Sequence, residues 1–389
     1  MTSFLAFGGV SIIYRAVGVL VALCCIAQSS RNRVQYGTSL RIFLIILGLM
    51  TAKVVYHCFF GDYAHTYLVN SKNQSLLFAF GVVWLPLIAI IKSYGKINDK
   101  KVLTIMMVCL VLMMIKALVS LQASEVSSDG RYQLNEHQST LAFGDNGAML
   151  AILSATIIAK AKNITSKYKK LIICFSLFAL VIGMMSILKA GSRGPLVSCM
   201  AALAFVFLVM RAQTKFMLII AILCCLFFGL LSMDVIAEYA PALVDRMTNT
   251  IEDGDTSGRD VIFLSAWGMI MKSPILGSNP LLLFSNGFGS FHNVYLSIGV
   301  GLGVVGMVAF VILIINLLVK TIMLRKNITS IFNLFIIAMF WFFAIRGVTG
   351  IYILSNGTYC AVLALTCLIL NRASISNRGK LRYVRLKKN

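Results

Sequence analysis

Charged residues, and acids above all, are scarce in this chain. They make up 12% of the 389 residues, and only 13 residues are Asp or Glu. Soluble domains normally contain about 25% charged residues. Hydrophobic residues make up 59% of the chain. This composition excludes a soluble globular protein and indicates a membrane protein.

Several chemistries lack the residues that they need. The sequence has no G-x-x-x-x-G-K-[ST] loop for ATP, and no H-E-x-x-H or C-x-x-C pattern for a metal. No D-x-D pair lies in a basic loop to hold a metal and a nucleotide sugar. The ten cysteines lie within or at the edges of apolar runs, without the spacing of a disulfide framework. We therefore expect no cofactor, no bound metal, and a donor other than a nucleotide sugar.

The chain contains long apolar runs instead. A helix needs roughly 20 mostly apolar residues to cross a bilayer, and helices can satisfy their own backbone polar groups there. We count about eleven (10–12) such runs by this length criterion. We predict an all-α, polytopic membrane bundle that forms a single integral domain over residues 1–389, with the first apolar run as its first span.

The net charge of +22 is distributed as short basic clusters between the apolar runs. Nucleic-acid binding would instead need a folded basic face. Basic clusters mark the cytoplasmic loops of membrane proteins, and here they occupy alternate loops, whereas the acids other than Asp99 fall in the remaining loops. This pattern predicts an outside N-terminus, a basic cytoplasmic tail at 371–389, and a main outer loop at 233–291.

Two arginines are predicted to lie at the outer boundary of the membrane. Arg193 lies in a tight turn with Gly191 and Gly194, and Pro195 suits the first position of the span that follows, so the turn should hold Arg193 at a helix N-terminus. Arg259 should begin an amphipathic helix of residues 259–271 that lies in the membrane interface. A guanidinium group at a helix N-terminus is suited to binding phosphate oxygens. A plain turn with an arginine that reaches the interface is the alternative for Arg193.

His292 is predicted to lie on the same side, at the start of another span. Histidine titrates near neutral pH, so it can accept a proton from an incoming hydroxyl group. An N-terminal residue that bonds the neighbouring backbone is the alternative. Two arginines that stabilise a diphosphate leaving group and one histidine that acts as general base would support glycosyl transfer from a lipid diphosphate.

Other basic residues are candidate accessory contacts for the same substrate. We predict Lys189, Arg131 and Arg346 to surround the outer cavity, although Arg131 lies among acids and a local ion pair is its default interpretation. Lys53 and Lys116 lie inside spans, where a side chain that reaches to the interface is favoured over an anion ligand.

Three motifs together resemble the bacterial O-antigen polymerase and O-antigen ligase superfamily, in the family's order. They are Gly-Ser-Arg-Gly at 191–194, Ser-Gly-Arg at 257–259 followed by Lys-Ser-Pro-Ile-Leu-Gly at 272–277, and His292-Asn293 followed by Gly303-x-x-Gly306. The similarity extends roughly from Gly130 to the end of the chain.

The resemblance implies a GT-C-like, metal-independent, inverting glycosyltransferase of the bacterial inner membrane, with an active site that faces the periplasm. Its donor would be a glycan linked to undecaprenyl diphosphate. Arg193 and Arg259 would bind the diphosphate, His292 would activate the acceptor hydroxyl, and Asn293 would contact the substrate. Family members commonly have both ends inside, so the predicted outside N-terminus departs from their pattern.

Two activities within the superfamily remain open. A polymerase joins repeat units on the carrier lipid, whereas a ligase transfers the finished glycan to the lipid A core. We favour the polymerase, because only about fifteen residues separate Gly277 from His292. A chain-length regulator protein would then be an expected partner. We expect ligases to have a longer segment there.

A transporter of an anionic lipid is a third and less favoured interpretation. Lys53, Lys116 and Arg15 would then line its pathway. Such a transporter is expected to contain inverted repeats and broken helices in both halves, and the sequence has no internal repeat that we can find.

Overall fold

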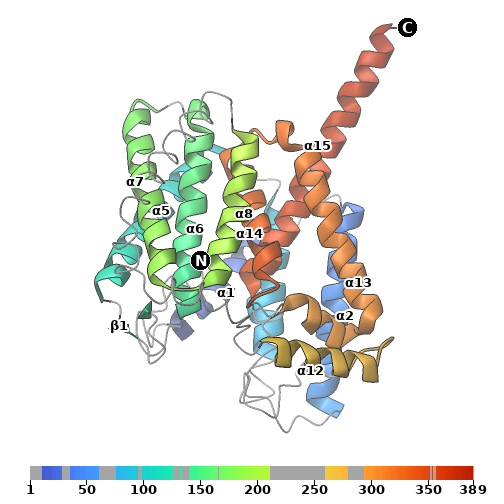
Figure 1. The fold of residues 1–389 in the computed structure, drawn as a ribbon. Coiled ribbons are helices and arrows are strands. Elements are labelled where there is room, and N and C mark those ends of the chain that lie inside the picture. The colour runs from blue at the N-terminus through green and yellow to red at the C-terminus, as the bar shows by residue number, and fades with distance from the viewer. Residues whose placement is uncertain are drawn as a thin grey trace. The chain divides into compact units, whose positions relative to one another are not determined.

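The computed structural model is helical and describes residues 11–28, 36–60, 76–94, 99–123, 125–126, 132–133, 140–164, 166–210, 259–278, 293–350, 353 and 356–388. Its helices, shown in Figure 1, are α1 (Ser11–Gln28), α2 (Thr38–Phe60), the π-helix η1 (Leu77–Trp84), α4 (Leu85–Ser93), α5 (Asp99–Ala123), α6 (Thr140–Ala159), η3 (Ala161–Asn163), α7 (Lys169–Lys189), α8 (Arg193–Val209), α12 (Arg259–Lys272), α13 (Val294–Met323), η4 (Arg325–Asn327), α14 (Ile331–Arg346) and α15 (Gly357–Lys388). Two short strands, β1 (Glu125–Val126) and β2 (Tyr132–Gln133), pair in antiparallel fashion.

Six of the described helices are long and apolar enough to cross a membrane. They are α2, α6, α7, α13 and parts of α5 and α15, and four shorter apolar helices accompany them. This architecture confirms the predicted polytopic helical membrane protein. The apolar run that precedes the predicted outer loop lies outside the described residues, as does most of the loop at 233–291.

The helices group into two compact units. The first contains Met1–Ile97, Ser257–Asn327 and Arg346–Asn389, and the second contains Asn98–Thr256 and Ile328–Ile345. A single domain over residues 1–389 and the orientation of the chain in the membrane stay predictions.

In the second unit, α6 lies between α7 and α8 (Figure 1). Gly147 of α6 faces Gly183 of α7, and a Cβ on Gly147 would lie 2.7 Å from the carbonyl oxygen of Gly183. Small residues allow two membrane helices to approach this closely. On the side of α8, Gly144 of α6 similarly leaves space for the ring of Pro195. The start of α8, which carries Arg193, is therefore packed firmly against α6.

In the first unit, α2 packs against α13 and α15, and α4 packs against α1 and α15. The indole Nε1 of Trp84 donates a 2.8 Å hydrogen bond to Oγ1 of Thr51, which joins η1 to α2. The helix α12 runs crosswise to α13 and packs against it (Figure 1). The predicted helix at 259–271 is thus confirmed, and it ends one residue later, at Lys272.

Candidate functional site

Arg193 lies at the N-terminus of α8, as the sequence predicted, and the helix begins at Arg193 itself, two residues before Pro195. The preceding turn depends on Gly191, whose φ of 60° lies in the left-handed region that side chains disfavour. Among the described residues, the side chain of Ser192 accepts no hydrogen bond from the first turn of α8. The first N–H groups of a helix have no partner within the helix, so this end can face an anion beside the half-buried Arg193.

Lys189 lies at the end of α7, just before this turn. Its Nζ donates a 2.6 Å hydrogen bond to the carbonyl oxygen of Leu121 near the end of α5. This contact gives Lys189 a structural role, because an ammonium group can satisfy the carbonyl groups that a helix leaves open at its C-terminus. Its predicted role as a substrate contact is untested.

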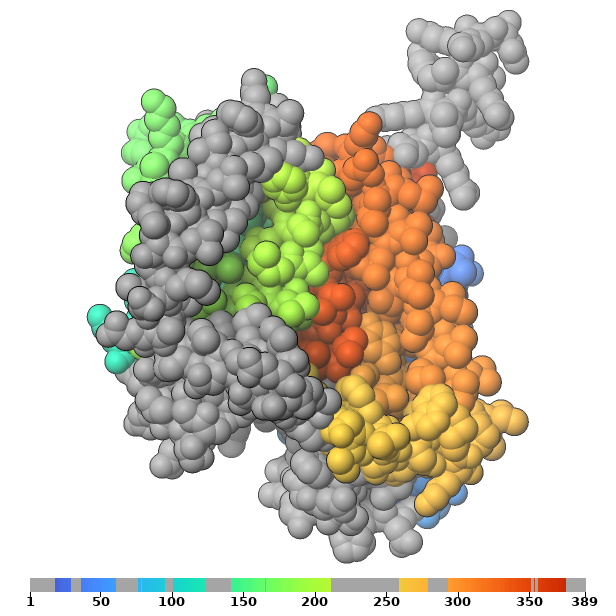
Figure 2. All heavy atoms as spheres, in the orientation of Figure 1, coloured from blue at the N-terminus to red at the C-terminus, as the bar shows by residue number. Residues whose placement is uncertain are grey.

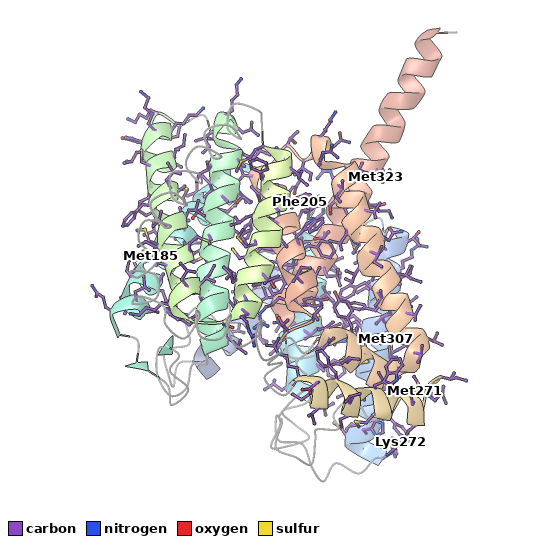
Figure 3. All side chains as sticks on the ribbon, viewed as in Figure 1. Met185, Phe205, Met271, Lys272, Met307 and Met323 are labelled. Atoms are coloured by element: carbon purple, nitrogen blue, oxygen red, sulfur yellow. The ribbon has the colours of Figure 1, made fainter. Side chains whose placement is uncertain are left out.

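Arg259 is the first residue of α12 and is half-buried. One face of α12 packs through Ile262, Ala266 and Ile270 on Val300 of α13, and Met307 covers the same cluster. The opposite face is also apolar but exposed, and it comprises Val261, Leu264, Trp267 and Met271. Figure 2 shows α12 at the surface beside α13, and Figure 3 shows Met271 and Lys272 at the C-terminal end of α12. A helix that is apolar on both faces is suited to lipid surroundings.

The helix α13 begins at Val294, and His292 lies just before it, outside the described residues. Asn293 is buried, with 6% of its surface exposed, and its Oδ1 accepts the N–H groups of Tyr295 and Leu296 at 2.9 and 3.1 Å. Asn293 is thus the N-cap of α13. The capping bonds alone are a sufficient reason for an asparagine at this position. The predicted contact between Asn293 and the substrate is untested.

A second contact fixes the start of α13. The N–H of Val294 donates a 2.7 Å hydrogen bond to the carbonyl oxygen of Gly347, which follows α14. Arg346 precedes this glycine, is 1% exposed, and donates from Nη1 to Oγ1 of Thr349 at 3.0 Å. A guanidinium group as buried as this one stabilises the turn at 346–350, whereas its predicted contact with substrate is untested.

The helix α13 is broken at Gly303, whose φ is 73° and ψ is −176°. Residues 273–278, the junction loop, fill the break. Val304 donates its N–H to the carbonyl oxygen of Pro274 at 2.7 Å, whereas the carbonyl oxygen of Val300 accepts the N–H of Ser278 at 2.6 Å. In an unbroken helix, Val304 would donate to Val300. The junction loop therefore supplies a new acceptor for the N–H of Val304 and a new donor for the carbonyl oxygen of Val300.

Two glycines make this junction sterically feasible. A Cβ on Gly303 would collide with the carbonyl oxygen of Pro274, and a Cβ on Gly277 would collide with the backbone of Gly301. Gly277 also has a φ of 70°. These contacts give a physical reason for the Lys-Ser-Pro-Ile-Leu-Gly motif and for Gly303. Gly299 serves a different purpose in α13, because it leaves space for the side chain of Ile270.

Sequence reasoning missed the partner of Lys53. Its Nζ donates a 3.1 Å hydrogen bond from α2 to the carbonyl oxygen of Gly277 in the junction loop. A lysine within an apolar run was the only signal, and it did not identify an acceptor 224 residues away.

The structure thus places the candidate residues in two groups. Arg259, Asn293 and Arg346 belong to the first unit, and Lys189 and Arg193 belong to the second. Arg131 and His292 lie outside the described residues. Chemically, the two arginines offer guanidinium groups at helix N-termini, a combination that suits oxyanions of phosphate. In the described part of the chain, no three His, Cys, Asp or Glu side chains come together as metal ligands would.

Residues 178–311 match the model of the O-antigen ligase family. The matched range contains Arg193, Arg259, the junction loop and the break of α13, and it supports the O-antigen ligase and polymerase superfamily that the motifs indicated. No curated protein matched the chain in a separate comparison.

Proposed function

We propose that this protein is an O-antigen polymerase that joins repeat units linked to undecaprenyl diphosphate at the periplasmic face of the bacterial inner membrane. One observation carries the proposal: Arg193 and Arg259, which both lie within the family match, are each the first residue of a helix. Helix N-termini and guanidinium groups both favour the negative charge of a diphosphate.

The proposed reaction is an inverting transfer without a metal. The acceptor hydroxyl oxygen attacks the anomeric carbon of the donor glycan, and the bond from that carbon to the diphosphate oxygen breaks. His292 accepts the hydroxyl proton, and undecaprenyl diphosphate leaves with the bonding electrons. Arg193 and Arg259 stabilise the charge that develops on the leaving diphosphate, which preorganised charges do most effectively in a water-poor site.

The exposed apolar face of α12 supports a lipid-linked donor. Leu264 is 72% exposed, and Ile275 and Leu276 of the junction loop are 73% and 74% exposed. Arg259 at the start of the same helix would therefore bind a head group whose hydrocarbon chain lies in apolar surroundings. This proximity would allow a diphosphate to reach the arginine while its lipid stays in the membrane.

The ligase is the second candidate, and the description of the matching family favours it. The short segment between Gly277 and His292, about fifteen residues, favours the polymerase. In either case the donor, the diphosphate contacts and the general base would be the same, and only the acceptor would differ.

An assay with purified protein in liposomes and EDTA tests both candidates. The protein receives undecaprenyl-diphosphate repeat units with and without lipid A core, and the products are separated on a gel. A ladder on the carrier lipid alone would support the polymerase, and a product only with core would support the ligase. Bound donor without any product would favour the transporter.

Variants test the assigned residues in the same assay. Arg193→Ala and Arg259→Ala should each lower the rate roughly 100-fold or more, as expected for a lost charge contact in the transition state. His292→Ala should lower it by about 100- to 10,000-fold. Arg325→Ala is the matched control, because Arg325 bonds the carbonyl group of Ile322 within its own turn, at an exposed position. Full activity in a folded His292→Ala variant would refute the mechanism.

A further inference from the structure

The junction loop makes the first segment of α13, residues 294–302, a separate element. At its C-terminal end, two backbone hydrogen bonds to the junction loop hold the segment. The N–H of Val304 donates to the carbonyl oxygen of Pro274, and the N–H of Ser278 donates to the carbonyl oxygen of Val300. Oγ of Ser278 also donates to Val300 at 3.2 Å. At its N-terminal end, Val294 bonds Gly347. The position of the segment thus depends on these external contacts and not on a continuous helix.

The same segment is packed against α12. Ile270 of α12 lies in the space that Gly299 leaves open, and a Cβ on Gly299 would approach its Cδ1 to 2.7 Å. Val300 completes the buried cluster with Ile262 and Ala266. The junction loop connects the end of α12 to the break in α13, so α12, the loop and residues 294–302 form one packed body. Arg259 begins this body, and His292 lies two residues before its helical segment.

Lys53 links this body to α2. Its ammonium group donates to the carbonyl oxygen of Gly277, which also accepts Oγ of Ser273 at 2.9 Å. Gly277 is buried, and Lys53 is half-buried within an apolar span. Hydrogen bonds from a charged donor are about twice as strong as neutral ones, and an apolar environment weakens them less than water does. This bond therefore fixes the carbonyl group of Gly277, near the end of the loop.

We infer that Lys53 is a positioning residue for the transfer reaction. It holds the junction loop on α2 and thereby fixes Arg259, at the start of α12, relative to Val294, at the start of α13, through the body that the loop completes. The inference rests on the proposed function, because that function assigns Arg259 to the diphosphate and His292, which precedes Asn293 in the sequence, to the acceptor hydroxyl. Lys53 itself touches neither substrate nor the reacting atoms in this account.

The test compares Lys53→Met, Lys53→Arg and Lys116→Met in the full-length protein. Lys116 is the matched control, since it also lies within an apolar span, on α5. Hydrogen–deuterium exchange of the peptides that contain Ser278 and Val304 reports on the junction, and steady-state transfer gives kcat and KM for the lipid-linked donor. The exchange measurement needs no substrate, so it tests the link even if the proposed activity is wrong.

Lys53→Met should raise the exchange rate of these amides roughly tenfold, because a charge-assisted bond is lost. It should lower kcat by about tenfold to a hundredfold, with KM within about twofold, because misplacement of reacting groups affects the reaction more than binding. Lys53→Arg should restore both values, and Lys116→Met should change neither. If Lys53→Met does not fold, Lys53→Gln, which keeps a donor, should give intermediate values of both.

Unchanged exchange in Lys53→Met would refute the link. Faster exchange with unchanged kcat would show a structural contact only and would refute the positioning role, as would an equal loss of kcat in Lys116→Met. If transfer survives in His292→Ala, the proposed mechanism fails, whereas the link between Lys53 and Gly277 still stands or falls by the exchange result.

Discussion

The N–H of Val304, within α13, donates to the carbonyl oxygen of Pro274 in the junction loop at 2.7 Å. Gly303 makes this contact sterically feasible, because its backbone turns to a φ of 73° and a side chain there would collide with Pro274. A positive φ with ψ near 180° is essentially restricted to glycine, and this conformation costs a residue with a side chain of order 1–3 kcal/mol. We therefore predict that Gly303→Ala lowers the thermal stability of the purified protein and its transfer rate together.

Gly268→Ala is the matched control for this substitution. Gly268 lies on α12, and a Cβ added to it would meet nothing within 4 Å. Alanine should be neutral there or stabilise the helix by up to about 1 kcal/mol. The melting temperature of each variant is measured in detergent, from the loss of the monodisperse peak in size-exclusion chromatography on heating. Equal melting temperatures for Gly303→Ala and the unmodified protein would contradict the assigned role of the break.

The N-cap assignment of Asn293 predicts rescue by other capping residues. Asn293→Ala should destabilise the start of α13 by about 1 kcal/mol, whereas Asn293→Asp and Asn293→Ser should retain most of the stability. Transfer should follow the same order, since His292 precedes the cap directly. Initial rates and melting temperatures of the three variants provide the measurement.

The alternative for Asn293 gives a different order. If its amide group bound the glycan, neither aspartate nor serine would replace the amide N–H, and all three variants would lose transfer while the Asp and Ser variants stayed stable. Such a result would return Asn293 to the substrate-binding residues that the sequence suggested.

The close contact of α6 with α7 predicts a steric effect in the second unit. Gly183→Leu should destabilise the protein by several kcal/mol, because a Cβ there would already lie 2.8 Å from the backbone of Ala151 and of Gly147. Gly48→Leu on α2 is the control, since nothing lies within 4 Å of its Cβ position. Similar yields and melting temperatures for both variants would argue against this packing.

The two faces of α12 predict where its side chains lie relative to lipid. A cysteine at Leu264 should react slowly with a charged thiol reagent in liposomes, whereas a cysteine at the exposed Lys272 should react quickly. Mass spectrometry of the two peptides distinguishes the introduced thiols from the native cysteines. Fast reaction at residue 264 would place the exposed face of α12 in water and weaken the case for a lipid beside Arg259.

The sequence predicted the membrane helices well because their signal is local. The apolar runs at 41–60, 102–121 and 171–188 coincide with α2, α5 and α7, since roughly 20 apolar residues determine each span. Arg193 and Arg259 were likewise placed at helix starts, because a glycine-containing turn precedes Arg193 and an apolar helical pattern follows Arg259.

The junction could not be predicted in the same way. Glycine indicates both close packing and a positive φ, so Gly299 and Gly303 looked alike although one packs against Ile270 and the other breaks the helix. Asn293 is equally suited to capping a helix and to binding a sugar. The acceptor of Lys53 depends on tertiary structure, and no local pattern identifies it.

The distance in sequence between Lys53 and Gly277 also bears on how the protein is made. The ribosome synthesises Gly277 224 residues after Lys53, which takes about 10–45 s at the usual rates of translation. Through that interval Lys53 lacks the acceptor that it has in the folded protein. The contact between α2 and the junction loop can therefore form only late in synthesis, when the nascent chain has delivered the loop that accepts the bond from the lysine.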